Sequence, residues 1–222
     1  MFGKNKILPP KKGDNGQLLD IVNIFKTIQG EGPFIGMPAI FVRLGGCNLA
    51  CKFCDTQFDE FQVIKTDQII KEIEKLAITG NIKTHQLVVI TGGEPLRQNI
   101  TPLCQTLIDL GYQVQIETNG TIYQDLPEKT YIVCSPKNND QKKHYSINQQ
   151  LLPKINAFKF LISKYQKNYD FVPKNLNKLV YLQAIDEYDE QKNHQNTKLA
   201  LKLAQESGYL MTLQAHKIWQ ID

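Results

Sequence analysis

The sequence predicts an α/β fold, an incomplete TIM-like β/α barrel, on three observations. Apolar, β-rich runs alternate with helix-like segments, which is typical of a mainly parallel sheet with active-site groups at the carboxyl ends of its strands. Eight complete βα units would need about 250 residues, and the chain has 222. Clear helical segments are also fewer than strand segments, so we expect a barrel that does not close.

Eight strands and three helices are expected in chain order. The strand candidates are apolar, β-rich runs at Ile21–Thr27, Ala39–Leu44, Leu87–Thr91, Tyr112–Glu117, Tyr131–Cys134, Ala157–Ile162, Lys178–Ala184 and Leu210–Gln214. The helix candidates lie between them, at Thr66–Ile78, Thr101–Leu110 and roughly Tyr188–Glu206. Gly111 and Gly208 stand just past two of these helices, where a glycine favours helix termination.

Composition and charge exclude several classes of protein. Hydrophobic residues make up 41% and charged residues 22%, as in ordinary globular proteins. No apolar run approaches the roughly 20 residues that a membrane span needs, so we expect no membrane partner. The net charge of +4 comes from scattered lysines. This pattern favours a solvated surface over direct nucleic-acid binding, and it suits an anionic small substrate.

The chain is expected to form a single domain over residues 1–222, since this length can bury a sizeable core. Residues 1–18 are expected to be a flexible N-terminal tail and lead-in to the first strand. The tail carries lysines but no apolar segment, so it is not a secretory signal. We therefore expect a cytoplasmic protein, in which clustered cysteines more often bind metal than form disulfides.

The most informative pattern is a C-x3-C-x2-C array formed by Cys47, Cys51 and Cys54. It follows the strand Ala39–Leu44, so it lies in a loop at a strand's carboxyl end. Thiolates favour iron–sulfur clusters or zinc, but structural zinc usually has four protein ligands and no fourth Cys or His is nearby. Three cysteines on a [4Fe–4S] cluster leave one iron open for the amino and carboxylate groups of S-adenosylmethionine (SAM). A zinc site completed by a distant ligand is the alternative.

This spacing, with the aromatic Phe53 before the third cysteine, resembles the signature of the radical SAM superfamily. The stretch Thr91–Pro95, with sequence TGGEP, follows the next expected strand of the barrel and resembles the superfamily's GGEP motif. The resemblance implies a partial barrel of the radical SAM type and a catalytic cluster on the three cysteines. It also implies that Phe53 packs beside adenine and that the GGEP backbone and Glu groups receive the SAM amino group. Ordinary core packing is the alternative for Phe53.

Longer stretches resemble the 7-carboxy-7-deazaguanine synthase family and keep its order. They are Phe25–Gly32, Gly36–Leu44, Gly46–Thr56, Glu117–Gly120, Ser135–Lys137, Gln183–Asp186 and Gln214–Lys217. The resemblance implies a lyase of queuosine biosynthesis that contracts the ring of 6-carboxy-5,6,7,8-tetrahydropterin to 7-carboxy-7-deazaguanine with loss of ammonia. It further implies Mg²⁺, a homodimer and an electron donor such as flavodoxin or ferredoxin.

For this pterin, the most telling candidate is Arg43, which lies in an otherwise apolar strand. A charge there needs a partner, and its guanidinium fork suits the substrate carboxylate. A structural ion pair is the alternative. The loop around Gln29 offers backbone and amide groups that suit a pterin edge, with a plain tight turn as the alternative. Thr91 is expected to reach the substrate, with a turn-capping role as the alternative. The expected substrate contacts are Ile28, Gln29, Gly30, Arg43, Thr91 and the terminal carboxylate of Asp222.

For the cofactors, the resemblance implies SAM contacts from several regions and a Mg²⁺ ligand at Thr56. Mg²⁺ keeps several waters, so one hydroxyl plus the substrate carboxylate is enough to hold it. Glu117 is expected to take a ribose hydroxyl, with a solvated strand-end carboxylate as the alternative. Ala184 replaces a proline common in the family, so this loop is expected to be less rigid. The expected SAM contacts are Phe53, Cys54, Asp55, Gly93, Glu117, Ser135, Pro136, Lys137, Gln183, Ala184, Ile185 and Asp186.

Two other functions fit parts of the pattern. A glycyl-radical-enzyme activase of the same superfamily shares the cysteine array and the GGEP motif, but it acts on a protein and needs no pterin-like Ile28–Gly32 stretch. A non-catalytic metal-binding module would explain the cysteines but not TGGEP. Turnover of a small pterin would distinguish the synthase from the activase. Cleavage of SAM would distinguish the synthase from a metal-binding module.

Overall fold

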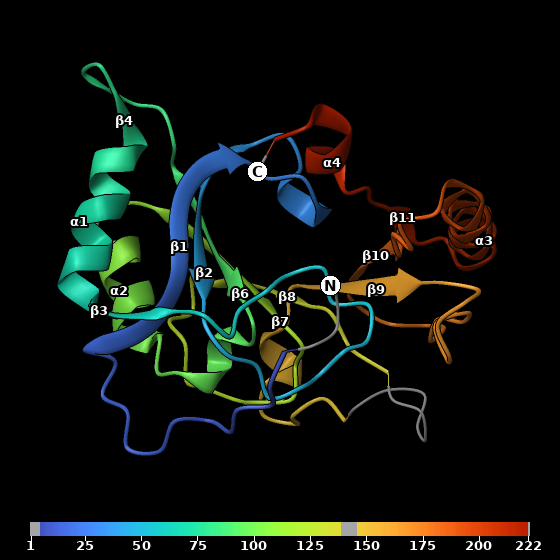
Figure 1. Cartoon of the computed structure of the whole chain (residues 1–222), viewed down its shortest axis with the longest axis horizontal. Helices are drawn as coiled ribbons and strands as arrows, with labels where there is room; N and C mark the ends of the chain where they lie inside the picture. The colour runs from blue at the N-terminus through green and yellow to red at the C-terminus, as the bar shows by residue number, and fades with distance from the viewer. Residues whose placement is uncertain (1–4, 139–145, 222) are drawn as a thin grey trace.

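The computed structural model describes residues 5–138 and 146–221 of the chain. Over these residues, nine strands form one curved sheet at the centre of the molecule (Figure 1). In chain order these strands are β1 (Leu18–Ile28), β2 (Pro38–Leu44), β3 (Gln62–Lys65), β6 (Leu87–Gly92), β7 (Gln113–Thr118), β8 (Tyr131–Cys134), β9 (Ala157–Ile162), β10 (Leu179–Ala184) and β11 (Leu210–Met211). A separate two-stranded hairpin consists of β4 (Ile78–Thr79) and β5 (Ile82–Lys83).

The spatial order of the sheet is β11-β10-β9-β8-β7-β6-β2-β1-β3. From β2 through β11 neighbouring strands run parallel, whereas β1 is antiparallel to both β2 and β3. The edge strands β3 and β11 are not neighbours, so the sheet curls without closing. The expectation of an incomplete β/α barrel is confirmed.

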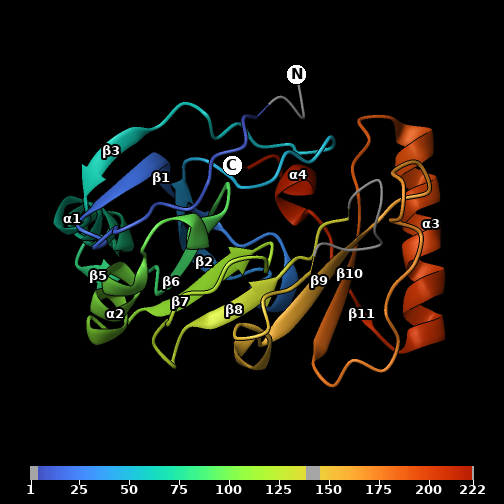
Figure 2. The same cartoon turned by 90° about the horizontal axis from the view of Figure 1, so that it is seen from below.

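Helices cover the outer face of this sheet near its two ends (Figure 2). At one end, α1 (Thr66–Ala77) packs on β1, β2 and β3, and α2 (Thr101–Asp109) packs on β7. At the other end, α3 (Glu190–Ser207) packs on β9, β10 and β11. The shorter helical elements are α4 (Ala215–Trp219) and the 3₁₀ turns η1 (Gly32–Phe34), η2 (Pro95–Arg97) and η3 (Leu152–Lys154).

All eight expected strands and all three expected helices are present. Element α3 starts after the cap residue Asp189, whose carboxylate accepts a hydrogen bond from the amide of Lys192 at 2.9 Å. It ends at Gly208, where φ is +73° and glycine removes the steric cost. The hairpin and β3 were not expected, because they are short and mostly exposed and so lack an apolar run.

Alternation along the strands separates an apolar core under the helices from an inner face that lines a cavity. In β2 the side chains of Ile40, Val42 and Leu44 join the main core under the helices, whereas Arg43 lines an internal cavity. Successive side chains of a strand point to opposite faces, so Arg43 faces the cavity while its neighbours Val42 and Leu44 face the outer core. This period carries the functional groups of the parallel strands inward.

The N-terminal segment differs from the expected flexible tail. From Asn5 onward it lies against the fold, and the amides of Leu8 and Lys11 donate to the carbonyls of Cys47 and Arg97 at 2.8 Å each. Residues 1–4 lie outside the described residues. No helix of the described residues is long and apolar enough to cross a membrane.

Candidate active site

A cavity of about 390 Å³ opens at the carboxyl ends of the parallel strands and extends into the barrel. Its walls come from the ends of β2, β6, β7, β8 and β10, as expected for a parallel α/β fold. The cavity brings together most of the expected site residues. These are Ile28, Gln29, Gly30, Arg43, Cys47, Cys51, Phe53, Cys54, Asp55, Thr56, Thr91, Gly93, Glu117, Ser135, Lys137, Gln183, Ala184, Ile185 and Asp186.

Two expected residues are not part of this lining. Pro136 is buried beside the cavity wall between Ser135 and Lys137. Asp222, the expected C-terminal substrate contact, lies outside the described residues. The expected C-terminal contact therefore stays a prediction.

The three cysteines lie in the cysteine loop, which we define as residues 47–58. All three are free thiols. Cys47 is buried and Cys51 and Cys54 are half-buried, and burial raises the pKa of each thiol, to about 12 for Cys47. Burial disfavours the negatively charged thiolate form of a cysteine. These three cysteines therefore need a positively charged partner, such as a metal, to become thiolates.

The donor set fits a four-iron cluster. Among the described residues, no three His, Cys, Asp or Glu side chains are grouped as a single metal ion would require. A [4Fe–4S] cluster binds each thiolate through a different iron, so its ligands need not converge on one point. Lys137 lowers the pKa of both Cys51 and Cys54 through its charge, although burial dominates. The cysteine loop therefore has the ligands, and nearby positive charge, for such a cluster.

The GGEP turn packs on the end of β2 and on Gly46, which leads into the cysteine loop. The amides of Gly93 and Glu94 donate to the carbonyls of Leu44 and Gly46 at 3.0 Å each. A Cβ on Gly93 would overlap the carbonyl oxygen of Gly46, and one on Gly92, where φ is +126°, would overlap that of Leu44. Backbone packing alone therefore requires glycine at both positions.

The carboxylate of Glu94 does not face the cavity, contrary to the expected role in receiving the SAM amino group. It is fully buried and accepts hydrogen bonds from the Thr118 hydroxyl at 2.6 Å and the Asn119 amide at 2.8 Å. The side chain of Asn119 in turn donates to Asn48 at 2.9 Å, inside the cysteine loop. The Glu94 side chain therefore ties the GGEP turn to the end of β7, and only the glycine backbone lines the cavity.

Arg43 extends into the cavity without a carboxylate partner in the described part of the chain. Its Nη1 donates to the Thr56 hydroxyl at 3.3 Å, and its guanidinium lies 5.8 Å from the centre of the Phe25 ring. Burial lowers the pKa of Arg43, and the charges of Asp55 and Glu117 oppose that shift. The alternative of a structural ion pair is not what the structure shows, so the fork is available to a ligand anion.

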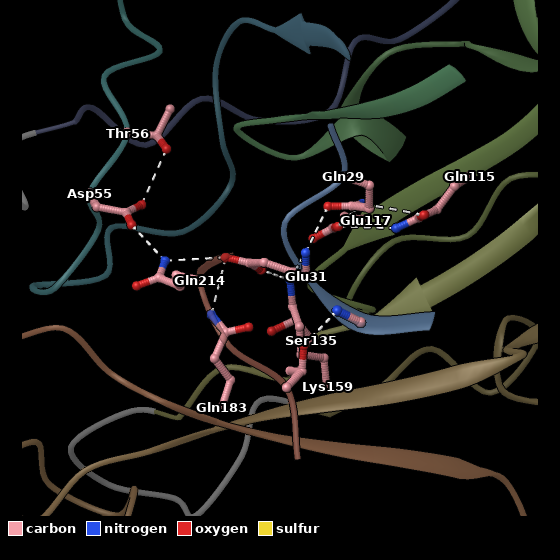
Figure 3. Close-up of polar contacts among 12 residues, drawn as sticks. Gln29, Glu31, Asp55, Thr56, Gln115, Glu117, Ser135, Lys159, Gln183 and Gln214 are labelled. Carbon is pink, nitrogen blue, oxygen red and sulfur yellow. Dashed lines mark hydrogen bonds and ion pairs between the residues drawn. The ribbon is translucent and has the colours of Figure 1, made fainter. Parts of the chain in front are cut away.

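A carboxylate–lysine network fills the deep end of the cavity (Figure 3). We define it as Gln29, Glu31, Gln115, Glu117 and Lys159. The ammonium group of Lys159, which is 6% exposed, pairs with Glu31 and, at 2.6 Å, with Glu117. The other Glu117 oxygen accepts hydrogen bonds from Gln29 at 3.2 Å and Gln115 at 3.0 Å. Both Glu117 oxygens therefore already accept hydrogen bonds. A ribose hydroxyl that bound Glu117, as expected, would have to share an oxygen with these donors.

Sequence reasoning missed several residues of this cavity. Lys159 stands in the apolar strand Ala157–Ile162, and that isolated charge is the same signal that revealed Arg43. The other missed residues carry no such signal: Glu31 also accepts hydrogen bonds from Gln183 and Gln214 at 3.2 Å each. Lys217, whose Nζ is 2.7 Å from Asp186 and 3.6 Å from Asp55, joins the short helix α4 to the cavity rim.

The cavity walls at the ends of β8 and β10 also carry polar groups. The Lys137 ammonium donates to the Ser135 hydroxyl at 2.6 Å. Gln183 donates to Glu31, but its buried Oε1 has no hydrogen-bond partner among the described residues. The rings of Phe53 and the buried Tyr169 form an edge-to-face pair with centres 5.0 Å apart, so the segment between β9 and β10 helps to position Phe53. A buried acceptor without a donor is costly unless a ligand satisfies it.

An open parallel barrel with a three-cysteine loop at the carboxyl ends of its strands defines a radical SAM enzyme. A family model described as the radical SAM superfamily matches residues 41–134. The 7-carboxy-7-deazaguanine synthase of Rickettsia prowazekii is 49% identical over 100% of this chain and 96% of its own length. That of Synechocystis sp. is 32% identical over 89% of this chain and 90% of its own length.

Structure comparison agrees with these sequence matches. The crystal structure of QueE from Escherichia coli matches with a TM-score of 0.72 at 26% identity, over 88% of this chain and 93% of that chain. The chain belongs to the 7-carboxy-7-deazaguanine synthase family.

Proposed function

We propose that this chain converts 6-carboxy-5,6,7,8-tetrahydropterin to 7-carboxy-7-deazaguanine, with loss of ammonia, in queuosine biosynthesis. The observation that carries the proposal is the combination within one cavity of a three-thiol loop and the unpaired guanidinium of Arg43. The conversion needs no net oxidant, because the product is the substrate less one ammonia. Neither a protein-activating enzyme nor a metal-binding module is favoured by the named relatives.

The cofactors would occupy the mouth of the cavity. Cys47, Cys51 and Cys54 would hold a [4Fe–4S] cluster, and its fourth iron would take SAM. Bound there, the two groups would supply the radical chemistry, which removes a hydrogen from C6 of the pterin and returns one after the ring has contracted. The chain's own residues orient SAM: Phe53 offers a ring face to adenine, and Gly93 brings its backbone close. Ser135, Lys137 and the Gln183–Asp186 stretch would hold the remaining groups of SAM.

The substrate would lie deeper, between the cysteine loop and the carboxylate–lysine network. Its carboxylate would pair with Arg43, whose fork can form two parallel hydrogen bonds. Its amide- and amine-rich ring would face Gln29, which is 1% exposed and already fixed by Gln115 and Glu117. The backbone of Ile28 and Gly30, together with Thr91, would close the sides. A pre-ordered polar wall lowers the cost of binding.

Mg²⁺ would sit between Thr56 and the substrate carboxylate. The Thr56 hydroxyl lies 3.3 Å from both Arg43 and Asp55 in the structure. A hard cation prefers such oxygen ligands and does not compete for thiolates. The metal would neutralise charge on the carboxylate and orient it alongside Arg43. We further propose a homodimer in the cytoplasm, reduced by a flavodoxin or a ferredoxin.

The test is turnover by the anaerobically reconstituted enzyme with SAM, a reductant and the carboxylated tetrahydropterin. We expect a product lighter by one ammonia and indistinguishable from 7-carboxy-7-deazaguanine. The same enzyme should leave an otherwise identical pterin without the carboxylate unconverted. SAM cleavage without conversion of the carboxylated pterin would overturn the proposal.

A further inference from the structure

The described N-terminal segment forms a second wall on the cysteine loop. Residue Ile7 bridges Cys47 in parallel pairing, and the Leu8 amide donates to the Cys47 carbonyl at 2.8 Å. One step earlier, the Lys6 amide donates to both carboxylate oxygens of Asp59 at 2.9 and 3.1 Å. These bonds hold the segment at both ends of the cysteine loop.

Asn5 is the residue of this segment that reaches a thiol. Its side-chain Nδ2 donates to the Thr56 carbonyl at 2.8 Å and lies 3.8 Å from the sulfur of Cys54. Its Oδ1 accepts a hydrogen bond from the Phe58 amide at 3.2 Å. A primary amide has two N–H groups and one carbonyl, so each of the three contacts can use a separate hydrogen or lone pair. The side chain is therefore fixed in the orientation that directs one N–H at sulfur.

The surroundings of Cys54 make that N–H important. The Cys54 sulfur also lies 3.5 Å from the carbonyl oxygen of Thr56, but a carbonyl cannot donate a hydrogen bond to a thiolate. On Cys47, the Leu49 backbone amide donates to the sulfur at 3.4 Å. The Asn5 contact thus gives Cys54 a donor of the kind that the loop backbone already gives Cys47.

We propose that Asn5 is a positioning residue that sets the reduction potential of the cluster through Cys54. Hydrogen bonds to the sulfurs are among the features that set cluster potentials. An N–H aimed at a thiolate favours the more negative, one-electron-reduced cluster, so it raises the potential. The proposal rests on the proposed function for the presence of the cluster, but not on the identity of the substrate.

The experiment is a redox titration of the reconstituted enzyme, followed by the electron paramagnetic resonance signal of the reduced cluster. Two variants remove the donor: Asn5→Ala, and Asn5→Asp, which keeps an acceptor for the Phe58 amide. Asn15→Ala is the matched control, because it lies in the same segment and contacts the Gln17 amide instead of a thiol. Iron content, SAM binding and pterin turnover of the unmodified enzyme are measured in parallel.

We expect both Asn5 variants to load iron and to show a midpoint potential shifted to more negative values. The shift should be larger for Asn5→Asp because it adds negative charge, while Asn15→Ala should match the parent enzyme. A fully loaded Asn5→Ala enzyme with the parent potential would overturn the proposal, as would an equal shift in Asn15→Ala. Failure of both Asn5 variants to assemble a cluster would also overturn it, because Asn5 would then serve only to fold the loop.

These outcomes separate the inference from the proposed function. If the parent enzyme has a cluster and converts the pterin, but Asn5→Ala shows no shift in midpoint potential, only the inference about Asn5 is wrong. If the parent enzyme has a cluster but does not convert the pterin, the substrate assignment is wrong. The inference about Asn5 is then decided by the potential shift alone. A parent enzyme that binds no iron–sulfur cluster sinks both.

Discussion

The cysteine loop and the carboxylate–lysine network are two walls of one cavity, and they differ in how far the protein satisfies them by itself. In the network, Lys159 pairs with both carboxylates, and four side-chain amides donate hydrogen bonds to Glu117 and Glu31. In the cysteine loop, burial raises the pKa of all three thiols and no single-ion site forms among the described residues. The network is organised before a ligand arrives, whereas the loop needs its cofactor to complete its electrostatics.

Replacing a cysteine should therefore have the largest effect on chemistry. Cys51→Ala removes one of three ligands, so we expect loss of the cluster and of SAM cleavage, measured by iron and sulfide analysis and by 5′-deoxyadenosine release. The matched control is Cys104→Ala, since Cys104 is buried in α2 away from the cavity. It should retain the cluster. An intact cluster in Cys51→Ala would contradict the ligand assignment.

Replacing the central cation of the network should have the largest effect on stability. In Lys159→Met two mostly buried carboxylates, only 15% and 16% exposed, lose their counter-ion, so we expect a loss of about 3–5 kcal/mol in unfolding free energy. The control is Lys154→Met, which breaks the exposed pair of Lys154 with Asp125 and should change nothing measurable. Denaturant unfolding of both variants gives the comparison. Equal stability of the two variants would mean that the network does not hold the fold.

At the boundary between the two walls, Arg43 tests ligand binding. Arg43→Lys keeps the charge but cannot form a two-pronged pair, so pterin binding should weaken by about 1–3 kcal/mol. SAM binding should hardly change, which makes it the internal control in calorimetric titrations. Equal losses for both ligands would assign Arg43 a structural role.

The network also sets how stability depends on pH. Burial alone would raise the pKa of Glu31, but the adjacent Lys159 outweighs it and holds that pKa below its ordinary value of 4.5. The resulting stabilisation is complete above pH 4.5 and is lost as the pH falls through the lowered pKa. Lys159, whose pKa is raised by Glu117 and Glu31 against the effect of burial, loses its contribution only as pH rises above about 10.5. In Glu31→Gln the unfolding free energy, measured by denaturant unfolding, should therefore fall less steeply as the pH drops below 4.5.

The smallest expected effect is at Thr56. Thr56→Ala should raise the Mg²⁺ concentration needed for half-maximal pterin turnover and leave the cluster spectrum intact, because thiolates hold the irons without it. Slow SAM cleavage in the absence of the pterin should not respond to Mg²⁺ in either enzyme. Unchanged Mg²⁺ dependence in the variant would place the metal elsewhere.

The same two regions show what the sequence can and cannot predict. The cysteine loop was predicted because its three cysteines lie close together in the sequence, and Arg43 because a charge in an apolar strand needs a partner. Lys159 gave the same signal, yet its partners Glu31 and Glu117 are 128 and 42 residues away in the chain. Only the parallel register of the strands brings them together. The contact of Asn5 with Cys54 and the orientation of the Glu94 side chain away from the cavity depend on loop packing. Loop packing leaves no periodic pattern in a sequence.

The most direct test of the account is single-turnover conversion of the carboxylated tetrahydropterin by the reconstituted enzyme, with the product and SAM quantified together. We expect one 7-carboxy-7-deazaguanine and one ammonia per pterin consumed, no net loss of SAM, and no product from Cys51→Ala. Loss of SAM without any deazapurine product, from an enzyme with a full cluster, would contradict the account.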